Sequence, residues 1–200
     1  MNGGTAVDSK KKMTGMMIHG FAVAHAVAAA LLAQTLVGDE AVLTALTIAM
    51  IIAVARMNGA DWDTGAALAF LGICIGGYVG VRGATFLIKI IPGVGNAANA
   101  TVTFTTTEVL GWATYLFIKK GNSNPKDMTK AEKKALWKEA KTMQKKENQE
   151  SKRLYEAMSE NDKNEYESIM KQLKVKDLPE ETRDYLLNRL ETITRKYIDS

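Results

Sequence analysis

Residues Met13 to Gly38 read MTGMMIHGFAVAHAVAAALLAQTLVG, a run with no Asp, Glu, Lys or Arg. Three lysines, Lys10 to Lys12, precede the run, and Asp39 and Glu40 follow it. About 20 apolar residues of α-helix are enough to cross the hydrocarbon core of a bilayer. The run therefore predicts a membrane-spanning helix. A cleaved signal peptide is the alternative, although its apolar part is usually only about 7–15 residues long.

The charged residues divide the chain into two unlike parts. Residues 1–120 hold 8 Lys and Arg and 6 Asp and Glu, whereas residues 121–200 hold 18 and 16. The mean hydropathy of −0.10 is an average over both parts and describes neither. The net charge of +4 is small and evenly divided, so we do not expect a nucleic-acid partner.

Three more apolar segments follow the first, and we expect helices over 40–57, over 64–81 with a possible extension to 91, and over 96–118. Asn58-Gly59 and Pro92 to Gly95 are typical helix breakers between them. The last segment carries five threonines from Thr101 to Thr107 and alternates there between polar and apolar residues, as a strand does. A lone strand, however, cannot lie in lipid with its backbone unpaired. For the second segment, a buried helix of a soluble bundle is the alternative.

These segments predict an all-α protein, with a four-helix transmembrane bundle followed by a small soluble helical tail domain. The expected boundaries are a disordered lead-in over 1–12, a membrane domain over 13–121 and a charged cytosolic domain over 122–200. Lysines flank the first and last spans, at Lys10 to Lys12 and at Lys119-Lys120. Because basic residues stay on the cytoplasmic side, both termini are expected there.

The tail carries the signals of three helices. Thr129 with Glu132 is a capping box, Ser159 with Asp162 begins a second helix, and Asp177-Leu178-Pro179-Glu180 begins a third. Between Lys130 and Lys146 the chain is rich in lysine, which indicates either a solvated face or a surface for anionic lipid.

Two charged residues, Arg82 and Glu108, lie in or beside apolar segments, where an unpaired ion is costly. We expect a buried ion pair that fixes the register of the third and fourth helices, or a polar lining for a water or ion path. His19 and His25 are expected to form hydrogen bonds inside the bundle, with pH sensing as the alternative. Gly72, Gly76 and Gly80 recur every four residues and predict a helix-packing face, within the chain or between copies.

No catalytic, cofactor or metal motif is present in the sequence. HExxH, CxxC, GxSxG and phosphate-loop patterns are all missing, and His19 and His25 point about 120° apart on one helix. Cys74 lies in an apolar run and is expected to be a buried side chain. The sequence therefore predicts neither an enzyme nor a bound cofactor or metal.

Several stretches resemble one family: Ile18-His19-Gly20, Leu43 to Met50, Ile91 to Ala100 (IPGVGNAANA) and Thr107 to Ala113 (TEVLGWA). Over about residues 15–120 the chain is similar to the YcjF-type family of uncharacterised bacterial membrane domains. The resemblance implies a helical module of the bacterial inner membrane, with Arg82 and Glu108 at family positions. It also implies a link to a small GTPase, although this chain has no GTPase and instead carries its own charged tail.

Together these features predict a non-catalytic integral membrane protein, a scaffold or anchor that presents its tail to a cytosolic partner. A homo-oligomeric pore or a membrane-disrupting effector is the alternative. The expected partners are the lipid bilayer, further copies of the chain and a cytosolic protein, which is a GTPase by family resemblance only.

Overall fold

The computed structural model describes residues 3–32, 40–76, 98–121, 127–175 and 178–198, which contain seven helices and no strand. The all-α prediction is confirmed for this part of the chain. The helices are α1 (Gly3–Leu32), α2 (Glu40–Met57), α3 (Thr64–Gly76), α5 (Ala98–Lys119), α6 (Lys130–Glu156), α7 (Glu160–Leu173) and α8 (Glu180–Arg195).

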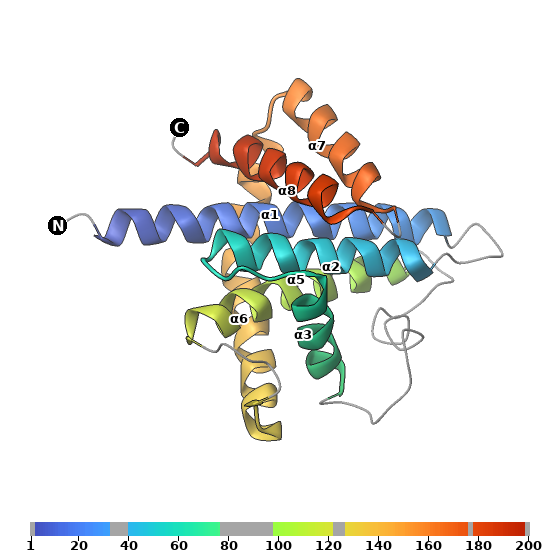
Figure 1. Ribbon diagram of the computed structural model, residues 1–200. Helices are drawn as coiled ribbons and strands as arrows, with labels where there is room; N and C mark the ends of the chain where they lie inside the picture. The colour runs from blue at the N-terminus through green and yellow to red at the C-terminus, as the bar shows by residue number, and fades with distance from the viewer. Residues whose placement is uncertain (1–2, 33–39, 77–97, 122–126, 176–177, 199–200) are drawn as a thin grey trace.

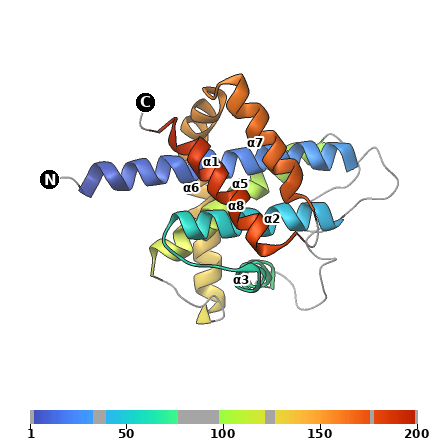
Figure 2. The same ribbon diagram turned by 45° about the horizontal axis from the view of Figure 1, so that its top comes forward.

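The long helix α1 lies at the centre, and the other elements pack around it (Figure 1). Helices α2 and α5 run antiparallel to α1. On α2, Leu43 contacts His25 of α1 while Met57 contacts Thr14. On α5, Glu108 contacts His19 while Trp112 lies against Gly15. Helices α7 and α8 cover one side of α1, and α6 runs across α1 (Figures 1 and 2). The charged C-terminal helices therefore share one hydrophobic core with the apolar helices.

Residues 3–12 are helical, so the prediction of a disordered lead-in over 1–12 is wrong for these positions. Two ion pairs involve residues of these first helical turns. Lys12 pairs with Asp8 one turn earlier at 3.2 Å, and Lys11 pairs with Glu147 of α6 at 3.1 Å. A helix propagates at low cost once it is nucleated. The packed apolar run of α1 therefore allows the helix to extend into these polar turns.

Among the described residues, one stretch is long and apolar enough to cross a membrane, and it is Asp8–Leu31 of α1. Within it, 67% of the residues in the most apolar window are buried against other helices. The apolar parts of α2 and α3, Val42–Met57 and Thr64–Cys74, are shorter than a span. The possible extension of the third helix and the break at Pro92 lie outside the described residues.

The two neighbours of α1 begin and end close to their predicted limits. Helix α2 covers the predicted 40–57, and Gly59 adopts φ 91° in the turn after it, a conformation that favours glycine. The threonine-rich segment is the helix α5 rather than a strand. Its polar residues Thr103, Thr107 and Glu108 are buried, as expected for a polar face that is turned inward.

Three glycines allow neighbouring helices to approach closely. A Cβ at Gly111 of α5 would lie 2.7 Å from the Ile18 side chain, and one at Gly15 would lie 2.5 Å from Ser151 of α6. A Cβ at Gly20 would lie 2.5 Å from the Tyr166 ring of α7. By contrast, Gly72 of α3 meets no described atom within 4 Å. The close packing of the described helices therefore occurs at α1 and α5.

The predicted caps of the C-terminal helices are confirmed at two places. Thr129 and Glu132 form a complete capping box at the start of α6, and Ser159 accepts a hydrogen bond from the Asp162 backbone at the start of α7. Helix α8 begins after Pro179 without a side-chain cap.

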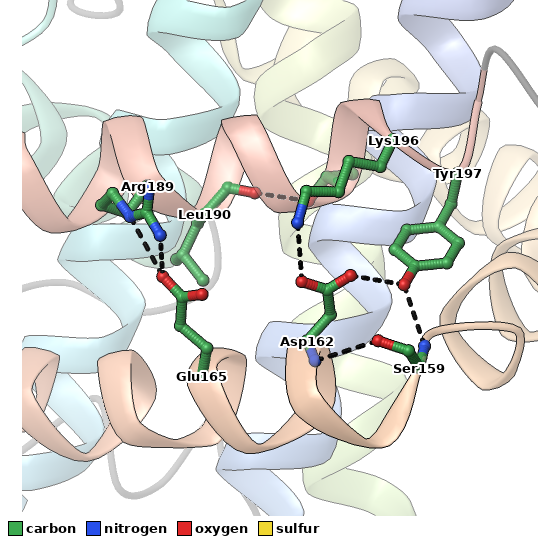
Figure 3. Close-up of polar contacts among 8 residues, drawn as sticks. Ser159, Asp162, Glu165, Arg189, Leu190, Lys196 and Tyr197 are labelled. Carbon is green, nitrogen blue, oxygen red and sulfur yellow. Dashed lines mark hydrogen bonds and ion pairs between the residues drawn. The ribbon is translucent and has the colours of Figure 1, made fainter.

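Helices α7 and α8 are tied together at their exposed side (Figure 3). Asp162 accepts a hydrogen bond from Lys196 Nζ at 2.8 Å and another from the Tyr197 hydroxyl, which in turn accepts one from the Ser159 backbone N–H at 2.9 Å. The Lys196 ammonium, helped by Tyr197, lowers the pKa of Asp162 below its usual value.

Replacing Asp162 with asparagine is expected to loosen this pairing. Because the pKa of Asp162 is lowered on folding, its stabilising effect is present above the ordinary value of 3.8 and is lost as the pH falls through the folded-state pKa. At neutral pH, backbone amides of α7 and α8 should exchange a few-fold faster in Asp162→Asn, since exposed pairs contribute little. The difference from the unmodified protein should vanish in strong acid. A persistent difference there would contradict the assignment to the carboxylate.

Candidate functional site

The most unusual group of side chains is a buried polar cluster formed by His19, Glu108 and Gln144. His19 Nδ1 lies 2.9 Å from Glu108 Oε1, and Gln144 Nε2 donates a hydrogen bond to Glu108 Oε2 at 2.7 Å. The three residues come from α1, α5 and α6, so the cluster joins the two apolar helices to the first charged helix. We call it the polar node.

The polar node is closed off from solvent. Glu108 is 2% exposed, His19 5% and Gln144 8%. The His19 ring also packs against two aromatic rings, with centroids 5.1 Å from Phe104 and 5.6 Å from Tyr155. A substrate therefore has no open path to these groups in the described part of the chain.

Both carboxylate oxygens of Glu108 have a partner, and this explains why the residue is tolerated in the core. A buried carboxylate is costly unless hydrogen bonds replace its hydration. When Glu108 is ionised, the hydrogen between it and His19 resides on Nδ1, so the imidazole donates. The arrangement fixes the register of three helices and leaves no free carboxylate oxygen for other chemistry.

The second histidine, His25, links α1 to α2 through its own hydrogen bonds. His25 Nδ1 lies 2.8 Å from the Phe21 carbonyl, and Nε2 lies 3.1 Å from the Thr47 hydroxyl and 3.3 Å from the Leu43 carbonyl. The side chain is fully buried. Both histidines therefore make the internal hydrogen bonds that were expected of them.

Another group of polar ties lies near the start of the apolar run of α1. Glu147 of α6 accepts from Lys11, Asp184 of α8 pairs with Arg56 of α2, and Arg183 of α8 donates to Thr64 Oγ1 at 2.7 Å. These contacts attach α6 to the start of the apolar run of α1, and α8 to the end of α2 and the start of α3.

The predicted partner of Glu108, Arg82, lies outside the described residues, so that ion pair stays a prediction. Among the described residues the Glu108 carboxylate contacts His19 and Gln144. Of the predicted glycine face, Gly72 is exposed and Gly76 ends α3, while Gly80 also lies outside the described residues. The prediction of a shared packing face stays a prediction. Cys74 is partly buried and packs against the core.

The sequence did not single out Gln144, Glu147 or Ser151, although α6 buries all three. Each lies in a stretch rich in Lys and Glu that reads as solvated. The available signal was their spacing, because they continue the helical stripe begun by Leu136 and Ala140. A polar residue within an apolar stripe is a sign of a buried polar partner.

The described residues contain no group of three His, Cys, Asp or Glu side chains that could hold a metal ion. A cavity of about 10 Å³ between α1, α2 and α8, lined in part by Met17, Ala53 and Leu187, has room for no more than about one water.

The comparisons with known proteins add no relative. No family model matches this chain, and neither a curated protein nor a solved structure is similar enough to count as a match. The likeness to the YcjF-type family therefore rests on the quoted sequence stretches alone.

Proposed function

We propose that this chain is a non-catalytic membrane protein, anchored by its apolar helices, whose charged helices present a surface to a cytosolic partner. The observation that carries the proposal is the uncharged run from Met13 to Gly38, which includes most of the span-length stretch of α1. In the full arrangement, α2, α3 and α5 lie in or against the membrane with α1 as a four-helix module of the bacterial inner membrane.

The distribution of contacts along α1 supports this arrangement. The close contacts of α1 with α6 and α7 lie between Lys11 and Gly20. Farther along, Val27 is 51% exposed and Leu31 is 57% exposed. The stretch from Gly20 to Leu32 is about 18 Å long. Its exposed apolar side chains are suited to lipid, while the charged helices stay at the level of the headgroups.

The ends of the helices also fit a cytoplasmic location for both termini. The start of α1 and the end of α8 lie at the same end of the molecule in both views (Figures 1 and 2). Lys119 and Lys120, at the end of α5, are exposed, and Lys120 pairs with Glu139. Basic residues at this end agree with retention on the cytoplasmic side.

A reporter fused after Ser200 tests the orientation. We expect a cytosol-dependent reporter to be active and a periplasm-dependent reporter to be silent, since basic residues flank the apolar helices at that end. Fusions after Gly121 should give the same pattern. A periplasmic signal from either fusion would contradict the proposed topology.

A membrane-disrupting or pore-forming protein is the second candidate. Its support is that α6, α7 and α8 cover part of α1, a packing that would shield apolar helices before insertion. Ion flux across vesicles that contain the purified protein separates the two proposals. The anchor predicts no flux above that of empty vesicles, and the pore former predicts flux that rises with protein concentration.

A further inference from the structure

Helix α6 carries five exposed lysines on one face, Lys130, Lys134, Lys138, Lys141 and Lys145. Successive members are four, four, three and four residues apart. At 100° per residue, all five lie within an arc of about 80°. We call this face the lysine stripe.

Opposite charges are kept away from the lysine stripe. Glu132 and Glu139 lie on the other side of the helix, where Glu132 closes the capping box with Thr129 and Glu139 pairs with Lys120. Within the described residues, none of the five lysines forms an ion pair. Like charges one turn apart destabilise a helix. The stripe therefore carries a repulsion that no ion pair within the described residues offsets.

The place of α6 in the fold indicates where that counter-charge lies. Helix α6 contacts α1 where the apolar run begins, through the Lys11–Glu147 pair and the close approach of Ser151 to Gly15. It runs across α1 rather than along it, and its first half reaches out to the side (Figures 1 and 2). When α1 enters a bilayer, α6 therefore lies along the headgroup layer.

We propose that the lysine stripe binds the anionic headgroups of the membrane in which the protein is anchored. This inference rests on the proposed membrane function. Lysine suits a diffuse anionic surface, because its ammonium is a flexible point charge, whereas arginine favours fixed two-point contacts. A lysine near an anionic leaflet contributes about a fivefold gain in association.

The test uses the full chain in vesicles of phosphatidylcholine alone and of phosphatidylcholine mixed with phosphatidylglycerol. Lysines are acetylated with a membrane-impermeant reagent, and each site is quantified by mass spectrometry. Two exposed lysines off the stripe, Lys146 and Lys171, are the internal standard. In anionic vesicles the stripe lysines should react more slowly than the standard, on the order of fivefold. High salt should remove the difference.

Two charge-matched variants accompany the test. In Lys138→Gln/Lys141→Gln the remaining stripe lysines should lose protection. In Lys146→Gln/Lys171→Gln, where the reaction rates of the stripe lysines are compared directly between neutral and anionic vesicles in place of the internal standard, protection should stay. Equal reactivity in neutral and anionic vesicles would overturn the proposal. Protection by a nucleic-acid duplex in place of anionic lipid would also overturn it.

The outcome distinguishes a failure of the lysine-stripe proposal from a failure of the membrane-anchor proposal. A protein that washes off neutral vesicles but floats with anionic ones, only while the stripe is intact, refutes the anchor and supports lipid binding by the stripe. A protein that stays in both vesicle types with unprotected stripe lysines refutes the stripe alone.

Discussion

Replacing Glu108 with alanine is expected to lower the free energy of unfolding by about 3 kcal/mol, the largest effect that we expect from a single substitution. The change leaves His19 and Gln144 buried without the carboxylate that they contact at 2.9 and 2.7 Å. The measurement is an unfolding curve of the purified protein in detergent, monitored by circular dichroism. The matched control is Glu139→Ala, which breaks a surface pair and should cost less than about 1 kcal/mol.

A double-mutant cycle then tests the polar node itself. His19→Leu and Glu108→Leu should each destabilise the protein, and together they should recover part of the loss, because apolar replacement of both members leaves no unpaired polar group. We expect a coupling energy of about 1 kcal/mol or more. Strictly additive losses would mean that the two side chains do not act on each other.

Gly20→Ala is expected to have the second-largest effect. The added methyl group would lie 2.5 Å from Cζ of Tyr166, whose hydroxyl donates to the Met17 carbonyl. The tyrosine has little room to move, since it is 1% exposed and its ring packs against Tyr155 at 5.6 Å. Overpacking of this kind costs about 1–3 kcal/mol. Denaturation of the purified protein measures it, and faster hydrogen exchange in α7 should accompany the loss.

The chain provides a matched control at Gly72, which is exposed and meets no described atom within 4 Å. Gly72→Ala should leave stability unchanged or raise it by up to about 1 kcal/mol, because alanine favours a helix more than glycine does. Adding Tyr166→Leu to Gly20→Ala should restore part of the lost stability. If the C-terminal helices did not pack on α1, the two glycine substitutions would behave alike.

The local features of the fold could be predicted from the sequence. The capping box of Thr129 and Glu132 and the cap at Ser159 depend on residues three apart, so they can be read without tertiary information. The bounds of α2 follow from flanking charges and the break at Asn58-Gly59. The helical lead-in could not be predicted, because it depends on tertiary contacts. These are the packing of the later turns of α1 and the ion pair of Lys11 with Glu147.

The packing of the charged helices on the apolar ones could not be predicted either. Tyr166 and Gln144 reach α1 and Glu108 across 149 and 36 residues of chain. Charge alone suggested Arg82, which lies outside the described residues, as the partner of Glu108. In the structure a histidine and a neutral amide also satisfy the carboxylate through two hydrogen bonds, which composition does not reveal.

Substitution of two exposed residues near the end of α1, Val27 and Leu31, distinguishes a membrane anchor from a soluble bundle. In lipid, arginine at both positions is costly, so Val27→Arg/Leu31→Arg should weaken insertion. In a soluble bundle the same exposed positions should tolerate the change within about 0.5 kcal/mol. Tyr185→Arg is the control, because Tyr185 is 63% exposed on α8.

Membrane fractionation with a carbonate wash tests the central claim most directly. We predict that the unmodified protein and Tyr185→Arg stay in the membrane pellet until detergent is added, and that Val27→Arg/Leu31→Arg shifts toward the supernatant. Recovery of the unmodified protein as a stable, soluble monomer would contradict the membrane anchor and would assign α1 to the core of a soluble bundle.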